Sequence, residues 1–145
     1  MINLFPAWPT RRDIVAATAA VAIWLVPCTS LAEQLAGSEW KPTQLYDKSV
    51  PADFDIFIQF GGEDRATGYG GCNRFTGRYS TDEQTIRIGP LASTRRACVP
   101  EVMDMENLFF KVLDSARSFQ RNRIDLILFD DAQVEIARLR QTDAD

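Results

Sequence analysis

The sequence predicts an α+β fold: a compact, mostly antiparallel, barrel-like β-sheet with one helix inserted before the last strands. Two observations lead to it. Short segments rich in aromatic and β-branched residues recur between residues 43 and 139, separated by glycine, proline and acidic turn residues. Residues 100–116 instead carry apolar residues three or four positions apart, as an amphipathic helix does. The 145 residues suffice for one such domain.

The strands are expected where apolar and polar residues alternate, after a lead-in over residues 33–40: at residues 43–46, 55–60, 85–88, 123–129 and 134–139. Residues 66–80 carry four glycines and predict one further strand, entered through a glycine bend. Its apolar face carries Phe75, Gly77 and Tyr79, and its polar face carries Arg74, Thr76 and Arg78. The last two strands are joined by a turn at residues 130–133.

The predicted helix begins at Pro100, which suits the first helical turn because proline has no amide hydrogen to bond. Glu101 and Asp104 complement the positive end of the helix dipole, whereas Lys111 and Arg117 lie near the negative end. With Glu106, these acids are expected to be solvated side chains at the start of the helix.

Residues 1–32 predict a signal peptide, for which the twin-arginine and the general secretory routes are the two alternatives. Arg11 and Arg12 precede an apolar run over residues 14–26, which is too short for a transmembrane helix. Small residues at Ser30 and Ala32 predict cleavage after residue 32, leaving a domain over residues 33–145. We therefore expect a periplasmic or secreted monomer that meets the membrane only during export.

Two alternatives to cleavage after residue 32 remain open. Leu25 lies three residues before Cys28, as in a bacterial lipoprotein signal, although Pro27 is a poor residue before a lipidated cysteine. The protein would then be anchored by a lipid on Cys28. Otherwise the apolar run is an anchor that is never removed.

The composition argues against several classes of function. The net charge of −4 is unsuited to a general nucleic-acid binder, which needs a basic face. The chain has no histidine, the commonest general base and metal ligand. Residues 68–73 lack the spacing of a phosphate-binding loop, and their glycines are read as allowing strands to approach. We expect no enzyme, no metal and no cofactor.

Cys72 and Cys98 are expected to form a disulfide, because disulfides persist in the compartments that exported proteins reach. The alternative is a reactive thiol at Cys98, whose thiolate Arg95 and Arg96 would favour.

Several arginines are candidates for a binding face. Arg74, Arg78 and Arg87 are placed on one face of the sheet, and Arg95 and Arg96 lie in the connection that follows. Together they could receive an anionic glycan, a lipid head group or a protein partner. The alternative is a solvated polar face whose charge nearby acids offset.

Several short motifs follow one another along the chain: Leu35-x-Gly37-x-x-Trp40, the run from Gly71 to Tyr79, residues 88–98, Met103-x-x-Glu106 and Leu126-x-Leu128-x-Asp130. As an ordered set, they resemble the META domain family of HslJ-like heat-shock and envelope proteins. The resemblance covers nearly all of residues 35–140. In one departure, Asp131 is followed by Ala132 where the family often has a glycine after the aspartate, so the type of that turn stays open.

The resemblance implies an antiparallel β domain with one helix and a role in stress and antibiotic tolerance, notably to novobiocin. The family has no established catalytic residues that could be assigned to this chain. Its characteristic residues are read as fold-making: Trp40, Gly71, Cys72, Asn73, Gly77, Thr94 and Cys98. The expected function is non-catalytic support of envelope homeostasis by binding an envelope protein or surface component. The alternative is a binder of a small or anionic ligand through the arginine-bearing face.

Overall fold

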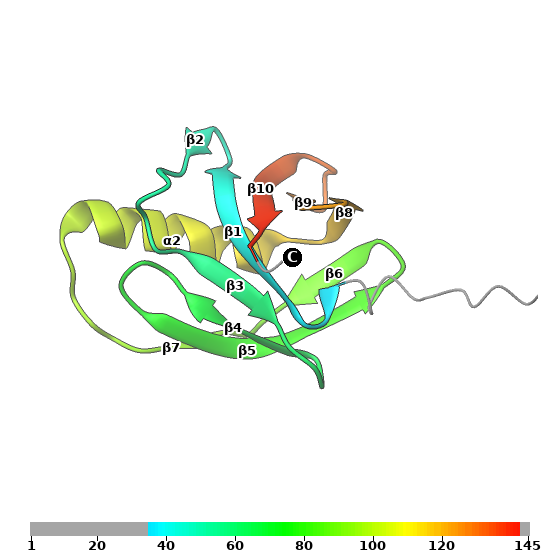
Figure 1. Cartoon of the computed structure of the whole chain (residues 1–145), viewed down its shortest axis with the longest axis horizontal. Coiled ribbons are helices and arrows are strands. Elements are labelled where there is room, and N and C mark those ends of the chain that lie inside the picture. Colours follow the sequence, from blue (N-terminus) through cyan, green and yellow to red (C-terminus); the bar gives the residue numbers. More distant parts are fainter. Residues whose placement is uncertain (1–34, 143–145) are drawn as a thin grey trace, which may run out of the picture.

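The computed structural model describes residues 35–142 and consists of β-strands with one long helix, α2 (Figure 1). The predicted signal peptide and Cys28 lie outside the described residues. In chain order the elements are β1 (Ser38–Leu45), β2 (Lys48–Ser49), β3 (Phe57–Phe60), β4 (Arg65–Tyr69), β5 (Arg74–Asp82), β6 (Thr85–Ile88), β7 (Ala92–Ser93), α2 (Pro100–Ser115), β8 (Ser118–Asn122), β9 (Asp125–Phe129) and β10 (Glu135–Gln141).

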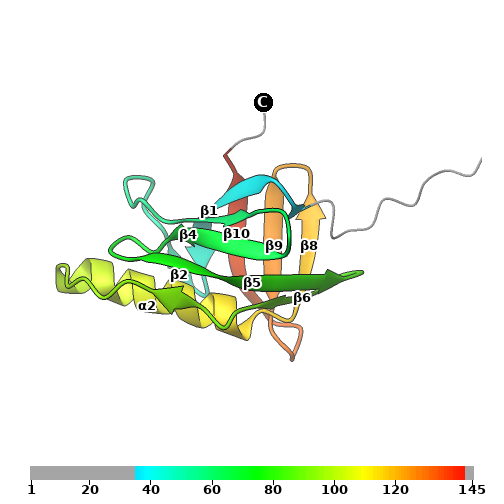
Figure 2. The same cartoon turned by 90° about the horizontal axis from the view of Figure 1, so that it is seen from below.

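Eight of these strands close into an antiparallel barrel. The strands neighbour one another in the order β10, β9, β8, β6, β5, β4, β3 and β1, and β10 pairs again with β1 to complete the ring. The short strands β2 and β7 add to β1 and β5. Figure 2 shows β8, β9 and β10 side by side and α2 along the lower side of the barrel. The predicted fold class is confirmed.

The first strand is longer than the sequence predicts. It begins at Ser38 rather than Thr43, and it includes Pro42, which pairs with Leu139 of β10. Proline cannot donate to a neighbouring strand, and the register shifts between Pro42 and Gln44. The proline is thus accommodated by an irregularity inside the strand instead of starting it.

The single strand predicted over residues 66–80 is in fact two strands, β4 and β5, joined by a tight turn at residues 70–73. The predicted faces of β5 are confirmed: Phe75 and Tyr79 are buried in the barrel, and Arg74 and Arg78 are exposed outside it. Gly68 on β4 allows a close approach, because a Cβ there would lie 2.2 Å from the carbonyl oxygen of Phe57.

Three strands follow the helix where two are predicted. The additional strand, β8, has the sequence Ser-Phe-Gln-Arg-Asn, in which Phe119 is the one apolar residue. It forms a hairpin with β9 through Arg123, whose φ of 55° is in the left-handed region. The last predicted turn is confirmed: Asp130 accepts hydrogen bonds from the amides of Ala132 and Val134, and Gln133 adopts the positive φ.

Helix α2 is confirmed with Pro100 in its first turn. Its buried apolar residues, Phe109, Val112 and Leu113, join the barrel interior, where Phe75 contacts the ring of Phe109 edge-on. Beyond the helix end, Arg117 donates a 2.6 Å hydrogen bond to the carbonyl of Asp114. Over residues 35–142, no helix has both the length and the apolar character that a membrane span requires.

Candidate functional site

The turn between β4 and β5 presents a pair of backbone amides to the helix. Gly71 has a φ of +106°, and the amide of Gly70 donates to the carbonyl of Asn73 at 2.8 Å, which closes the turn. The amides of Cys72 and Asn73 then point to one oxygen, Oε2 of Glu106, at 3.1 and 2.6 Å. Successive amides gathered in this way form a concave site for an anion, and here the protein's own carboxylate fills it.

Glu106 is a buried residue, and its prediction as a solvated acid is wrong. Only 2% of the residue is exposed, and its second oxygen accepts a 2.7 Å hydrogen bond from Nδ2 of Asn73. Gly70 makes room for it, because a Cβ at Gly70 would lie 2.6 Å from Oε2. The helical spacing of Val102, Glu106 and Phe109 puts Glu106 on the apolar face, and this was the signal that could have revealed its burial.

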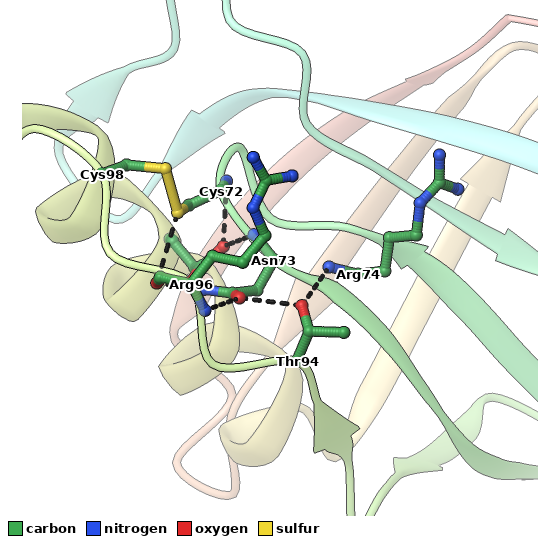
Figure 3. Close-up of a disulfide and its surroundings, with 7 residues drawn as sticks. Cys72, Asn73, Arg74, Thr94, Arg96 and Cys98 are labelled. Atoms are coloured by element: carbon green, nitrogen blue, oxygen red, sulfur yellow. Dashed lines mark hydrogen bonds between the residues drawn. A yellow bond between two sulfur atoms is a disulfide. The ribbon is translucent and has the colours of Figure 1, made fainter.

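The side chain of Asn73 ties the turn to the segment before α2 (Figure 3). Its oxygen accepts from the hydroxyl of Thr94 at 2.8 Å and from the amide of Arg96 at 2.7 Å, while Nδ2 donates to the carbonyl of Arg96 at 3.2 Å. The Thr94 hydroxyl also accepts from the amide of Arg74, and the Thr94 amide donates to the carbonyl of Arg74. One polar network therefore holds three segments that are distant in sequence: residues 73–74, residues 94–96 and, through Glu106, helix α2.

A disulfide joins Cys72 in the turn to Cys98, two residues before α2, with the Cα atoms 6.0 Å apart (Figure 3). The predicted pairing is confirmed. Cys72 is buried and Cys98 is exposed. The bond and the Asn73 hydrogen bonds fix the same segment, residues 94–98, against the same turn.

Two of the predicted arginines, Arg74 and Arg96, line one cavity of about 450 Å³ beside this network. In Figure 3 the side chains of Arg74 and Arg96 extend to the same side of the hydrogen-bond network. The other lining residues are Asp55, Phe57, Tyr69, Cys72 and Thr94. The Arg74 guanidinium carbon lies 6.0 Å from the centre of the Tyr69 ring. Within residues 35–142, neither arginine forms an ion pair.

The remaining predicted arginines lie elsewhere. Arg78 lines a different cavity, of about 740 Å³, which it shares with Glu63, Asp64 and Arg65. Arg78 is directly opposite Arg65 in the β4–β5 register, and Arg87 follows on β6. Arg95 is exposed and lines neither cavity. The predicted arginine group is thus divided between two places on the outer surface of the barrel.

The other two motif residues, Trp40 and Gly77, have packing contacts. Trp40 is completely buried, and its indole N–H donates to the hydroxyl of Ser38 at 2.7 Å. A Cβ at Gly77 would lie 2.8 Å from the carbonyl oxygen of Pro90, so only glycine lets β5 pass this segment.

Farther along β5 from the turn, the fold alters the acidity of Tyr79. Its burial, together with the negative charge of Asp64, raises its pKa above the ordinary value, and its hydroxyl donates to the carbonyl of Gly61 at 3.1 Å. In the part of the chain that the structure describes, no three His, Cys, Asp or Glu side chains are grouped as metal ligands would be.

With this geometry in place, comparison with known proteins identifies the family. The sequence model of the META domain matches residues 33–143. The chain belongs to the META domain family. No curated protein matches the sequence.

Solved structures share the META domain fold of this chain at low identity. A protein from Burkholderia xenovorans, solved by NMR, is 18% identical with a TM-score of 0.63, over 96% of this chain and 99% of the other. A DUF4847 family protein from Bacteroides vulgatus is 16% identical with a TM-score of 0.61, over 80% and 100%. A third protein solved by NMR is 23% identical with a TM-score of 0.61, over 75% and 92%. These likenesses show the fold alone.

Proposed function

We propose that this META domain protein is an exported, non-catalytic binding protein of the bacterial envelope. Like the HslJ-like proteins that it resembles, it supports envelope homeostasis under stress and tolerance to antibiotics such as novobiocin. Export is supported by the signal-like residues 1–32 and by the Cys72–Cys98 disulfide, which suits an oxidising compartment.

The observation that carries the proposal is the use of polar groups around the turn. The side chains of Asn73 and Glu106 form hydrogen bonds within the protein. The cavity beside them is lined by two arginines and two aromatic residues together with Asp55 and Thr94, and arginine and aromatic side chains are common at binding surfaces.

The partner of this face is a protein or a surface component of the envelope. Phe57, Tyr69 and Arg74 lie in one row across β3, β4 and β5, because each is the direct register partner of the next. Aromatic and arginine side chains are enriched at protein interfaces. A partner that offers acidic groups beside apolar ones would complement this row.

The test of partner binding is site-specific photo-crosslinking in the periplasm. A photoreactive residue replaces Thr76, which is exposed on β5 between Arg74 and Arg78. The control carries it at Asn122, which is exposed on β8. We expect a discrete adduct from position 76 and none from position 122. Equal labelling at both positions, or no adduct at either, would contradict the proposal.

The test of the physiological role is deletion of the gene followed by complementation. We expect deletion to increase sensitivity to novobiocin and to envelope stress, and the wild-type gene to restore tolerance. A gene carrying both Arg74→Ala and Arg96→Ala should not restore it, whereas Arg95→Ala should. A deletion strain as tolerant as its parent under every envelope stress would remove the support for this role.

Localisation is tested by the intact mass of the protein purified from its host. A chain that begins at Glu33 and carries no lipid is expected. A chain that begins at a lipidated Cys28 would establish the lipoprotein alternative, in which the barrel stays attached to a membrane.

A second candidate function is the binding of a small anionic ligand. The observation in its favour is the cavity of about 450 Å³ that Arg74 and Arg96 line, since ligand pockets of about 300–1,000 Å³ are typical. The two candidates differ in what the face contacts, and a ligand would be found in solution without any partner protein.

A further inference from the structure

We propose that the cavity lined by Arg74 and Arg96 binds a small aromatic monocarboxylate whose far end carries a hydrogen-bond donor. This deepens the proposed function and rests on it in one respect only, namely that the protein acts by binding.

The charges of the cavity select a single anionic group. Arg74 and Arg96 contribute two positive charges and Asp55 one negative charge. Guanidinium groups match the planar geometry of a carboxylate. A ligand with a second negative group would bring that group toward Asp55 and lose affinity through repulsion between like charges.

The strand register sets the size and shape of the ligand. Phe57 is paired with Tyr69, and Tyr69 with Arg74, so the three side chains stand on adjacent strands of the outer face. Neighbouring strands are about 4.8 Å apart, which places Phe57 about 10 Å from Arg74. One aromatic ring that carries a carboxylate on a short chain spans this length.

The aromatic residues provide the surface for the ring. Phe57 and Tyr69 are both half-buried, so each exposes part of its ring to the cavity. Aromatic rings that meet in offset or edge-to-face contact attract one another beyond the effect of the area that they bury. A donor at the far end of the ligand, such as a phenol hydroxyl, would reach Asp55, which precedes Phe57 by two residues and also lines the cavity.

The backbone that carries both arginines is fixed before any ligand arrives. The amide of Arg74 donates to the Thr94 hydroxyl, and the amide of Arg96 donates to the side-chain oxygen of Asn73. The disulfide at Cys98 fixes the chain two residues after Arg96. The Arg74 guanidinium also lies over the Tyr69 ring. Two arginines on a backbone that is already fixed lose less conformational freedom on binding, which favours affinity.

The test is a titration of the oxidised protein followed by NMR, with two sources of the same chemistry. One probe is free 3-(4-hydroxyphenyl)propanoate, and the other is a hexapeptide that ends in a C-terminal tyrosine. We expect saturable binding with a Kd on the order of 10–1,000 µM, which weakens as salt is added. The amide derivative of each probe, which lacks the negative charge, should bind at least about tenfold more weakly.

The variants locate the site. Arg74→Gln and Arg96→Gln are each expected to raise the Kd about tenfold, while Arg95→Gln, an exposed neighbour outside the cavity, should change it less than about twofold. Asp55→Asn should reduce the preference for the phenol over the same acid without its hydroxyl. All four positions are exposed, so folding is checked simply by an unchanged amide spectrum elsewhere.

The two probes distinguish a small molecule from a polypeptide C-terminus as the source of the ligand. Binding of the free acid, of the peptide, or of both supports the site, and the stronger of the two identifies a small molecule or a polypeptide C-terminus as its source. Absence of saturable binding for both probes up to about 10 mM overturns the inference, as does an equal effect of Arg95→Gln. A failed titration leaves the crosslinking and deletion results unaffected, so the two failures are distinguishable.

Discussion

At the scale of single residues, Glu106 matters most for the turn beside the disulfide. Three N–H groups converge on its carboxylate, two of them backbone amides, and the residue is almost entirely buried. A buried donor that loses its acceptor costs about 1–3 kcal/mol. The energetic cost of disturbing this residue should therefore exceed that of any nearby surface acid.

We expect Glu106→Ala to lower the free energy of unfolding by about 3 kcal/mol or more, because three donors lose their acceptor. Glu106→Gln keeps one oxygen for the two backbone amides but turns an NH₂ group toward Nδ2 of Asn73, so a loss of about 1–2 kcal/mol is expected. Urea denaturation of the oxidised protein measures both. Glu101→Ala, on the exposed first turn, is the control. A Glu106→Ala protein as stable as that control would disprove the role of the network.

Tyr79 predicts a dependence of stability on alkaline pH. Its pKa is raised in the folded protein, so the unfolded chain releases the phenol proton first as the pH rises through about 10. Below that range the tyrosine is neutral in both states and its contribution is fully present; above it, stability falls. Tyr79→Phe should flatten this decline while costing about 1 kcal/mol at neutral pH through the lost bond to Gly61. Urea midpoints from pH 8 to 11 would show it, and a parallel decline in both proteins would contradict it.

Residue types limited what could be foreseen at this scale. The cysteine pair was predicted from the export signal and the compartment that it implies, and the burial of Phe75 and Tyr79 from the alternation of apolar and polar residues. Glu106 did not, because a carboxylate on a helix is normally solvated, and its burial depends on donors supplied by a turn 33 residues earlier. The separation of Arg78 from Arg74 and Arg96 depended on where cavities form, which strand alternation cannot tell.

At the scale of elements, periodicity decides which segments can be recognised. Helix α2 and strands β6 and β10 follow their repeats closely and were found nearly in place. Strand β8 has only Phe119 as an apolar residue and is defined by its pairing with β9. Strands β4 and β5 merged in the prediction because glycines at residues 68, 70 and 71 conceal both the end of one strand and the turn.

The approach of β3 and β4 at Gly68 gives a prediction at this scale. Gly68→Ala would place a methyl group 2.2 Å from a backbone oxygen of β3 and 2.5 Å from the Phe75 ring. Neither the strand nor the core ring can move freely, so we expect a loss of about 3 kcal/mol or more, or failure to fold.

The matched control is Gly62→Ala, in the β3–β4 turn, where a Cβ would meet nothing within 4 Å. Its stability should lie within about 0.5 kcal/mol of the wild type. Thermal denaturation followed by circular dichroism compares the two. Equal melting temperatures for the two variants would show that β3 and β4 can separate at no cost.

At the scale of the whole molecule, the disulfide connects the sheet to the helix. It joins two residues that are 26 apart in the sequence, and a loop of that length predicts stabilisation by about 3–4 kcal/mol through the unfolded state. We expect the variant with both Cys72→Ala and Cys98→Ala to fold into the same barrel but to have its unfolding midpoint at a lower urea concentration. The wild-type protein in reducing buffer should show the same shift. An unchanged midpoint in both cases would rule out stabilisation by the disulfide.

The closure of the barrel also orders events in time. The first strand, β1, completes its hydrogen bonds only with the last, β10, from Trp40 paired with Gln141 to Leu45 paired with Ala137. A ribosome therefore releases nearly the whole domain before β1 has its second neighbour, and long-range pairing of this kind is slow. Until then, one edge of β1 has unpaired backbone groups that can bind another strand. A chain that stops before residue 135 keeps such unpaired edges on both β1 and β9. A truncated product is thus a substrate for chaperones and proteases from the moment it is made.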